Sequence, residues 1–187
     1  ENYEQHLLDI EKVLKRLSEN SLHVKLTKCE FAVPALEFCG MWVSSEGFNI
    51  QESQIEAVCN YPDFIPGKDK ELKWCQRFLG SVRFFADFVP YLADIALPLY
   101  DLTSESCSRK WSVEHTTAVR MIQSCITTSP VLSYFDPARP TTEVFTDASK
   151  YAIGGWLRQT DSEGNEHMVC FWSRKLTPAE VNYPTHE

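Results

Sequence analysis

The sequence lacks a surplus of positive charge. Its 187 residues include 18 lysines and arginines against 26 aspartates and glutamates, which gives a net charge of −8. A protein that binds nucleic acid on its own more often carries a basic surface that displaces counterions from phosphates. The balance therefore argues against a free-standing nucleic-acid-binding protein. Phosphate contacts are expected only where the charge is closer to balanced, between Tyr61 and Trp111.

The motifs of several other protein classes are also missing. The seven cysteines occur singly, without a CxxC pair or histidines at zinc spacing, so they are expected to be small buried side chains in a reducing compartment. The absence of HExxH, of a GxSxG elbow and of a glycine-rich phosphate loop excludes the enzymes that those motifs mark. No apolar run approaches the roughly 18–20 residues of a membrane span, so we expect an intracellular protein without a membrane partner.

The sequence does contain enough apolar residues for a core, at 43% of the chain, and they follow three successive patterns. Steps of three and four predict an amphipathic helix over 2–19, with Leu7, Ile10, Leu14 and Leu17 on one stripe. Two or three short antiparallel strands are predicted between 28 and 50, where Gly40 indicates a bulge or close backbone approach. Further helices are predicted over 53–60, 69–88, 90–98 and 112–128, and further strands over 144–146, 153–158 and 168–173.

Capping signals place the ends of several of these elements. Ser53, followed three residues later by Glu56, predicts a capping box at the start of the helix over 53–60. Ser112 is expected to cap the helix that it precedes, and Thr177 with Glu180 forms a second capping box near the end of the chain.

Asp147 lies where a strand should be most apolar, within "VFTDASKYAIGGWLRQ". A lone aspartate at a strand end most often caps a turn. The alternative is a carboxylate that binds a divalent metal at the mouth of a sheet, since magnesium prefers hard oxygen ligands. Small neighbours such as Gly154 and Gly155 would then let a polymer backbone approach. Spacing alone leaves both interpretations open.

The helix over 69–88 has two interpretations as well. Leu72, Cys75, Leu79, Val82 and Phe85 share one face, with Phe78, Phe84 and Phe88 widening it. Lys73, Arg77 and Arg83 could press a basic edge against a phosphate backbone, or they could simply be a solvated face opposite the core.

A series of segments in order goes beyond these general patterns. The series is "HLLDIEKVLKRLSENSLHVKLTKCEF", "LEFCGMWVSSEGFNI", "KELKWCQRFLGSVRFFADFVP", "ALPLYDLT", "SPVLSYFDPARP", "VFTDASKYAIGGWLRQ" and "CFWSRKLTPAEVNYPTHE". Over essentially the whole chain it resembles the polymerase polyprotein of gypsy-class LTR retrotransposons and their retroviral relatives.

The resemblance implies an α+β fold made of parts of two enzymes. Residues 1–52 would be the end of a reverse transcriptase palm with its primer-gripping hairpin, and 53–107 a helical thumb. Residues 108–129 would form a connecting helix, and 130–187 the first three strands of an incomplete RNase H-like domain.

Site residues follow from the same resemblance. Asp147 matches the first of four metal-binding carboxylates that hydrolyse the RNA strand of an RNA–DNA hybrid, so it is expected to be catalytic and to bind Mg²⁺, with Mn²⁺ as the alternative. Gly40 and Trp42 would lie in the primer-gripping hairpin. Lys73, Arg77 and Arg83 in the thumb would contact the duplex backbone.

The expected partners are an RNA–DNA hybrid, a template–primer duplex and the remaining parts of the polyprotein. The implied parent is an RNA-directed DNA polymerase and endoribonuclease H that acts in cytoplasmic virus-like particles or in the nucleus. Its oligomeric state is not predicted.

The sequence also departs from the family pattern. The paired polymerase aspartates would precede Glu1, and by register Glu187 is not expected to be the second RNase H carboxylate, so the chain is expected to be inactive alone. Ala86 and Asp87 replace expected phosphate contacts. These departures and the net acidity motivate an alternative function, a decayed or domesticated retroelement remnant that acts as a non-catalytic interaction module.

Overall fold

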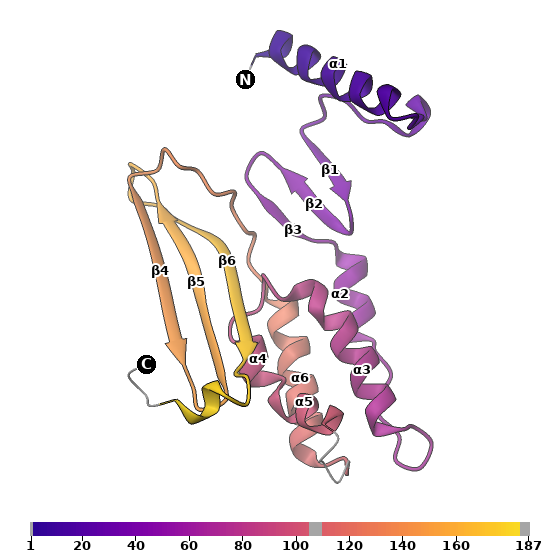
Figure 1. Ribbon diagram of the computed structural model, residues 1–187, viewed down its shortest axis with the longest axis vertical. Helices are drawn as coiled ribbons and strands as arrows, with labels where there is room; N and C mark the ends of the chain where they lie inside the picture. The colour runs from indigo at the N-terminus through magenta and orange to yellow at the C-terminus, as the bar shows by residue number, and fades with distance from the viewer. Residues whose placement is uncertain (1, 105–109, 184–187) are drawn as a thin grey trace. The chain divides into compact units, whose positions relative to one another are not determined.

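The computed structural model describes residues 2–104 and 110–183, and it divides into two compact units that adjoin at Pro34 and Ala35 in the sequence. Figure 1 shows the chain coloured from its N-terminus to its C-terminus. No helix in the described ranges is long and apolar enough to cross a membrane.

The first unit consists of α1 (Tyr3–Glu19), the short 3-10 turn η1 (Leu26–Lys28) and their connections. The side chain of Asn2 caps α1 by accepting a 2.8 Å hydrogen bond from the backbone N–H of Gln5. The predicted helix is thus confirmed. Ile10, Leu14 and Leu17 of its apolar stripe are only half-buried within this unit and Leu7 is exposed, so α1 does not build a core of its own.

The second unit holds two three-stranded antiparallel sheets, with strand orders β1-β2-β3 and β4-β5-β6, and several helices. Its elements are β1 (Ala35–Phe38), β2 (Met41–Ser44), β3 (Phe48–Ile50), α2 (Glu52–Cys59), α3 (Glu71–Val82), η2 (Arg83–Phe85), α4 (Leu92–Ile95), α5 (Leu97–Thr103), α6 (Val113–Thr127), β4 (Thr141–Ala148), β5 (Ala152–Thr160), β6 (Glu166–Lys175) and η3 (Glu180–Asn182).

The first sheet confirms the predicted strands and corrects the interpretation of Gly40. Cys39 and Gly40 form the two-residue turn between β1 and β2, with φ of 51° and 80°. Two successive positive φ values are typical of the tight turns that match the twist of a hairpin. Gly40 therefore allows a tight turn, and neither a bulge nor a close approach of another chain segment requires it.

The second hairpin of this sheet is tied to a distant part of the chain. Phe48 and Leu132 exchange backbone hydrogen bonds of 2.8 and 2.9 Å. A Cβ on Gly47 would overlap the carbonyl group of Leu132, so only glycine permits this approach. Ser133, next to Leu132, donates its backbone N–H to the carbonyl of Met168 in β6 at 2.7 Å. The hairpin and the second sheet are thus linked through one short segment.

Two details of the predicted helices are wrong. α2 begins at Glu52 with Gln51 as its N-cap, so Ser53 lies inside the helix and caps nothing. The helix predicted over 69–88 is the shorter α3 followed by η2, and Phe84 is exposed instead of lying on the apolar face. The short helix predicted between Pro90 and Pro98 is present as α4, and a second helix that was not predicted, α5, follows it, because proline is compatible with the first turn of a helix.

The predictions for the last part of the chain hold better. Ser112 precedes α6, and its backbone N–H donates to Nδ1 of His115 at 2.9 Å. The three predicted strands are present and longer than expected, with the hairpin tip between β5 and β6 as predicted. Thr177 and Glu180 form the predicted capping box, in which the Thr177 backbone N–H donates to the Glu180 carboxylate at 2.8 Å.

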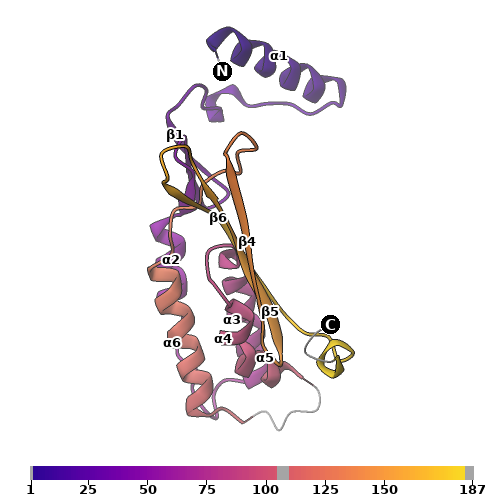
Figure 2. The same ribbon diagram turned by 90° about the vertical axis from the view of Figure 1, so that its left-hand side faces the viewer.

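The core of the second unit lies between its helices and one face of the β4–β6 sheet. Figures 1 and 2 both show α3 to α6 to one side of this sheet. α4 contacts β5 and β6, and Tyr91 meets Trp156 edge to face with ring centroids 6.1 Å apart. Buried residues of this core come from α2, α3, α5, α6 and β6.

The fold class, a mixed helix and sheet protein, is confirmed, whereas the domain boundaries at 52, 107 and 129 stay predictions. The boundary at 107 lies outside the described residues.

The cysteine prediction holds only in part. Cys75 is buried, and burial raises the pKa of its thiol to about 12. Cys39 is exposed in the tight turn, and the other cysteines in the described ranges are half-buried.

Candidate nucleic-acid interface

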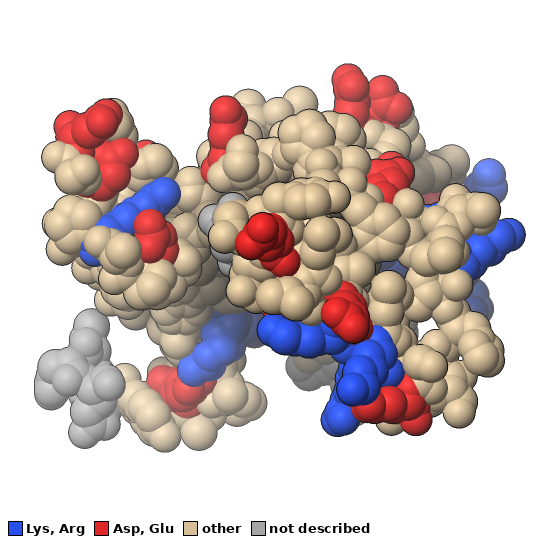
Figure 3. Space-filling view, turned by 90° about the horizontal axis from the view of Figure 1, so that it is seen from above, with Lys and Arg blue, Asp and Glu red and all other residues tan. Residues whose placement is uncertain are grey.

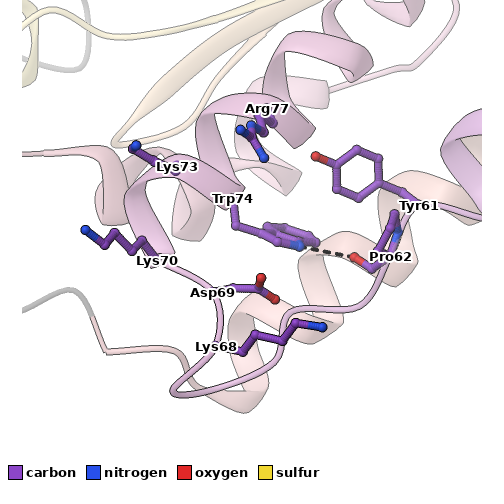
Figure 4. A pocket seen from close by; sticks show the side chains of 8 residues that line it. All are labelled: Tyr61, Pro62, Lys68, Asp69, Lys70, Lys73, Trp74 and Arg77. Carbon is purple, nitrogen blue, oxygen red and sulfur yellow. Dashed lines mark hydrogen bonds between the residues drawn. The ribbon is translucent and has the colours of Figure 1, made fainter.

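A cavity of about 570 Å³ lies where the loop after Tyr61 meets the first two turns of α3. Its lining residues are Tyr61, Pro62, Lys68, Asp69, Lys70, Lys73, Trp74 and Arg77, and we call this group the basic pocket. Figure 4 shows the Tyr61 and Arg77 side chains extending toward one another over the Trp74 ring, with Lys68 and Asp69 on the other side of that ring in this view. Two of the residues predicted to contact a duplex, Lys73 and Arg77, are thus brought together.

The loop that walls the pocket is held by its own hydrogen bonds. The backbone N–H of Ile65 donates to the Asp69 carboxylate at 2.8 Å. The carbonyl of Ile65 in turn accepts from the N–H groups of Lys68 and Asp69. Because Asp69 is occupied in closing this turn, its carboxylate pairs with none of the neighbouring cations in the described structure.

Aromatic packing fixes the floor of the pocket. Trp74 stacks on Phe78 with ring centroids 5.2 Å apart, and Tyr61 meets both rings edge to face at 5.3 Å. The indole N–H of Trp74 donates to the carbonyl of Pro62 at 3.1 Å. Trp74 and Phe78 are buried, so the pocket is attached to the core and not to a free loop.

Spacing along α3 explains why its cations gather here. Lys70, Lys73 and Arg77 are separated by three and four residues, which places them on one side of the helix. Burial of Trp74 on the adjoining stripe leaves Lys73 and Arg77 exposed beside it. With Lys68, the pocket has four cations against the single carboxylate of Asp69, a net of +3 in a chain of net −8.

None of these four cations forms an ion pair or a side-chain hydrogen bond with another described residue. On the face drawn in Figure 3, acidic and basic side chains are scattered in small clusters. The concentration of cations in the basic pocket does not follow from the composition of the chain, which is net acidic.

The Tyr61 hydroxyl completes the polar lining. Its side chain is half-buried, and burial raises the pKa of the phenol while the nearby charge of Arg77 opposes that rise. At neutral pH the group is protonated and available as a neutral hydrogen-bond donor. Sequence reasoning missed Tyr61, Lys68 and Lys70 because the pocket is completed by a loop whose path no periodicity predicts.

Arg83 does not join this group. It is exposed in η2 and lines a separate cavity of about 410 Å³ together with Arg174 and Lys175. Both of those cations are already paired: Arg174 contacts Glu180 at 2.8 Å and Lys175 contacts Asp101 at 2.6 Å.

The predicted hairpin residues form a third location. Trp42 in β2 is 49% exposed and lines a cavity of about 580 Å³ with Asn49, Gln51 and Ile55 among its other residues. Gly40 lies in the adjoining turn, where its carbonyl accepts from the N–H of Gln51 at 3.2 Å. The roles of Gly40, Trp42, Lys73, Arg77 and Arg83 in binding stay predictions.

Asp147 lies in β4 opposite Gly154 of β5, and it is exposed. One of its carboxylate oxygens accepts a 2.9 Å hydrogen bond from the N–H of Ala148, which is local capping of its own chain. Within 2–104 and 110–183 no group of three His, Cys, Asp or Glu side chains is placed to hold a metal ion. The described residues therefore do not make a metal site by themselves, and Glu187 lies outside them.

The glycines near Asp147 have a packing role. A Cβ on Gly155 would overlap the carbonyl of Phe145 on the neighbouring strand, and one on Gly154 would lie 3.1 Å from the carbonyl of Trp172. The sheet itself thus requires glycine at 155, whether or not a ligand approaches, whereas position 154 is only tightly packed.

Comparison with known proteins places these features in a family. Residues 111–187 match the model of the RNase H-like domain found in reverse transcriptase. The chain is 31% identical over 179 residues to the transposon Tf2-3 and Tf2-4 polyproteins of Schizosaccharomyces pombe; the match covers 96% of this chain and 13% of each polyprotein. The chain thus spans only a small part of these relatives.

Solved structures give the same answer for the fold. The foamy viral protease–reverse transcriptase in complex with an RNA/DNA hybrid has a TM-score of 0.70 and 27% identity, covering 98% of this chain and 24% of that chain. A second structure, foamy viral protease–reverse transcriptase dRH in complex with double-stranded DNA, also has a TM-score of 0.70, and its match covers 31% of that chain. Over almost its whole length the chain is therefore similar to the reverse transcriptase and RNase H-like proteins of retroelements, as its ordered motifs predicted.

Proposed function

We propose that this chain holds an RNA–DNA hybrid or a template–primer duplex as part of a retroelement reverse transcriptase. The observation that carries the proposal is the likeness, over 98% of the chain, to a reverse transcriptase that was solved in complex with an RNA/DNA hybrid. The unpaired cations of the basic pocket support it, because phosphate contacts dominate the affinity of proteins for nucleic-acid duplexes.

The contacts would be distributed over separate places in the second unit. Lys73 and Arg77 would bind backbone phosphates from α3, and Arg83 would do so from η2. Trp42 would meet the primer end from the first sheet, where its exposed ring is free to pack against a sugar or base. Such contacts position a duplex without reading its sequence.

RNA-directed DNA polymerisation and hydrolysis of the RNA strand are proposed for the longer polyprotein and not for this chain alone. Asp147 is proposed as one catalytic carboxylate and one ligand of Mg²⁺ or Mn²⁺. A single carboxylate offers too few ligands to hold the two metal ions of such a reaction. The chain by itself is therefore expected to hydrolyse no RNA. Its expected protein partners are the remaining parts of the polyprotein.

Binding of a fluorescein-labelled RNA–DNA hybrid, followed by anisotropy at low and at 0.1 M salt, tests the proposal. The chain should bind, and the double variant Lys73→Gln/Arg77→Gln should weaken binding roughly 60-fold at 0.1 M salt, because each lost phosphate contact costs about eightfold there. Lys15→Gln, which removes an exposed charge from α1, is the matched control and should change little. No binding at low salt would contradict the proposal.

A second candidate is a domesticated, non-catalytic interaction module. The net charge of −8 favours it, as does Asp87, which occupies an expected phosphate contact. The Asp87 carbonyl instead accepts from the N–H of Phe171 in β6 at 2.9 Å and so serves packing. Stable folding of the chain without any hybrid binding would favour this candidate.

A further inference from the structure

The basic pocket contains two hydrogen-bond donors that no described side chain or backbone group uses. Neither the Arg77 guanidinium nor the Tyr61 hydroxyl has a hydrogen-bond partner among the described residues. Figure 4 shows the two groups extending toward one another on the same side of the Trp74 ring. The charge of Arg77 opposes the rise in the pKa of Tyr61 that burial causes.

We propose that the basic pocket is a preformed site for one phosphate group of a nucleic-acid strand, with Arg77 and Tyr61 as its hydrogen-bond donors and Lys68 and Lys73 as flanking charges. This inference rests on the proposed function and deepens it, since it adds Tyr61 and Lys68, which belong to the loop and not to the face of α3.

The donor set fits an oxyanion such as a phosphate better than an apolar ligand. A guanidinium donates through a planar fork that matches two oxygens of a phosphate. A protonated phenol adds a third hydrogen bond without adding charge. An apolar ligand would leave these donors unsatisfied.

The floor holds these donors in place before a ligand arrives. Tyr61 is fixed by its edge-to-face contacts with Trp74 and Phe78, so its hydroxyl has little freedom to lose on binding. Arg77 follows Trp74 by one turn and leaves the same helix beside the ring. Donors that are ordered in advance reduce the entropy cost of binding.

The cations extend beyond a single anion, which favours a strand over a free phosphate. From Lys70 to Arg77 the side of α3 runs seven residues, or about 10 Å at 1.5 Å per residue. Successive phosphates of one strand in a duplex are about 3.4 Å apart along the axis, so this row matches the axial rise of about three of them. A free phosphate would use one end of the row and leave the rest unpaired.

Conservative variants distinguish specific hydrogen bonds in the basic pocket from a general effect of charge on hybrid binding. Tyr61→Phe keeps the aromatic packing and removes only the hydroxyl; it should weaken binding of the hybrid about threefold to tenfold, as expected for one hydrogen bond. Arg77→Lys keeps the charge and loses the fork, and it should also weaken binding, whereas Lys15→Gln should not. Lys68→Gln should cost about eightfold at 0.1 M salt.

The outcomes distinguish this inference from the proposed function. If the unaltered chain binds the hybrid while Tyr61→Phe, Arg77→Lys and Lys68→Gln bind as tightly, the pocket is not a phosphate site although the proposed function stands. If the chain fails to bind the hybrid at all, the proposed function fails first, and the inference fails with it.

Orthophosphate identifies the source of the phosphate group. Line broadening of the ³¹P signal of millimolar orthophosphate on addition of the chain should be weak, and orthophosphate should displace the hybrid no better than chloride of equal ionic strength. Tight, Arg77-dependent binding of orthophosphate without binding of the hybrid would overturn the assignment to a nucleic-acid strand.

Discussion

The cations of α3 and those of the β4–β6 sheet stand in opposite situations. In the sheet, Arg158 contacts Glu143 at 2.8 Å and Glu166 at 2.6 Å, and Arg174 and Lys175 have carboxylate partners of their own. In the basic pocket, Lys73 and Arg77 have no such partner among the described residues. Basic side chains of one acidic chain are thus paired with carboxylates in the sheet and unpaired in the basic pocket.

Whether a cation already pairs with a carboxylate decides how readily it can bind an anionic ligand. A cation that already pairs with a carboxylate must lose that pair before it can contact a phosphate, and the loss offsets the gain. An unpaired, exposed cation only exchanges water and counterions, which favours association. Net charge therefore misleads for this chain, because the lining of the basic pocket carries four cations and a single carboxylate.

The largest expected effect comes from removing the support beneath the pocket. Phe78 is fully buried and stacks on Trp74, so Phe78→Ala should lower the free energy of unfolding by about 3–5 kcal/mol. Hybrid binding should fall with it, since the floor under Tyr61 collapses. Urea denaturation measures the loss, and Val144→Ala, at a side chain that is 65% exposed, should stay within about 0.5 kcal/mol.

Two arginine variants, one in the sheet and one in the basic pocket, should affect stability and hybrid binding in opposite ways. Arg158→Gln breaks two ion pairs and a contact with the Phe145 ring, whose centroid lies 5.0 Å away, so the urea midpoint should fall while hybrid affinity stays unchanged. Arg77→Gln should do the reverse. An equal loss of stability in both variants would show that Arg77 is structural.

The smallest expected effect is a pH dependence confined to the sheet end. A hydrogen bond from Arg174, then bonds from Thr177, lower the pKa of Glu180 from 4.5 to about 2. A carboxyl whose pKa is lower in the folded state contributes stability above its unfolded value and loses that contribution as pH falls toward the folded value. Glu180→Gln should therefore flatten the loss of stability between pH 4.5 and 2. Identical acid unfolding curves for the variant and the parent chain would contradict this.

Sequence reasoning succeeded where one local rule decides the outcome. The periodicity of α1, the caps of α6 and the alternation in β4 to β6 each depend on neighbours in the chain, and each element formed as predicted. Ser53 failed as a cap because Gln51 already takes the extended conformation that precedes α2. Phe84 failed as a core residue because it follows Phe78 by six residues, a spacing that places it off the face shared by Phe78 and Phe85.

The candidate site was predictable only in part. Lys73 and Arg77 could be found from helical spacing, since four residues bring them to one side. Tyr61 and Lys68 could not, because their place depends on how Asp69 closes the loop and how Trp74 meets Pro62. Asp147 could be named only through the resemblance, because it lies within β4 and the hydrogen bond that its carboxylate accepts comes from the adjacent residue, Ala148.

The salt dependence of hybrid binding tests the central claim most directly. The logarithm of the binding constant should fall linearly with the logarithm of salt concentration, and the slope should be smaller by about 1 for Arg77→Gln than for the unaltered chain, as one lost phosphate contact requires. Arg174→Gln, at a cation paired with Glu180, should leave the slope unchanged. Equal slopes for Arg77→Gln and the unaltered chain would contradict a phosphate contact at the basic pocket.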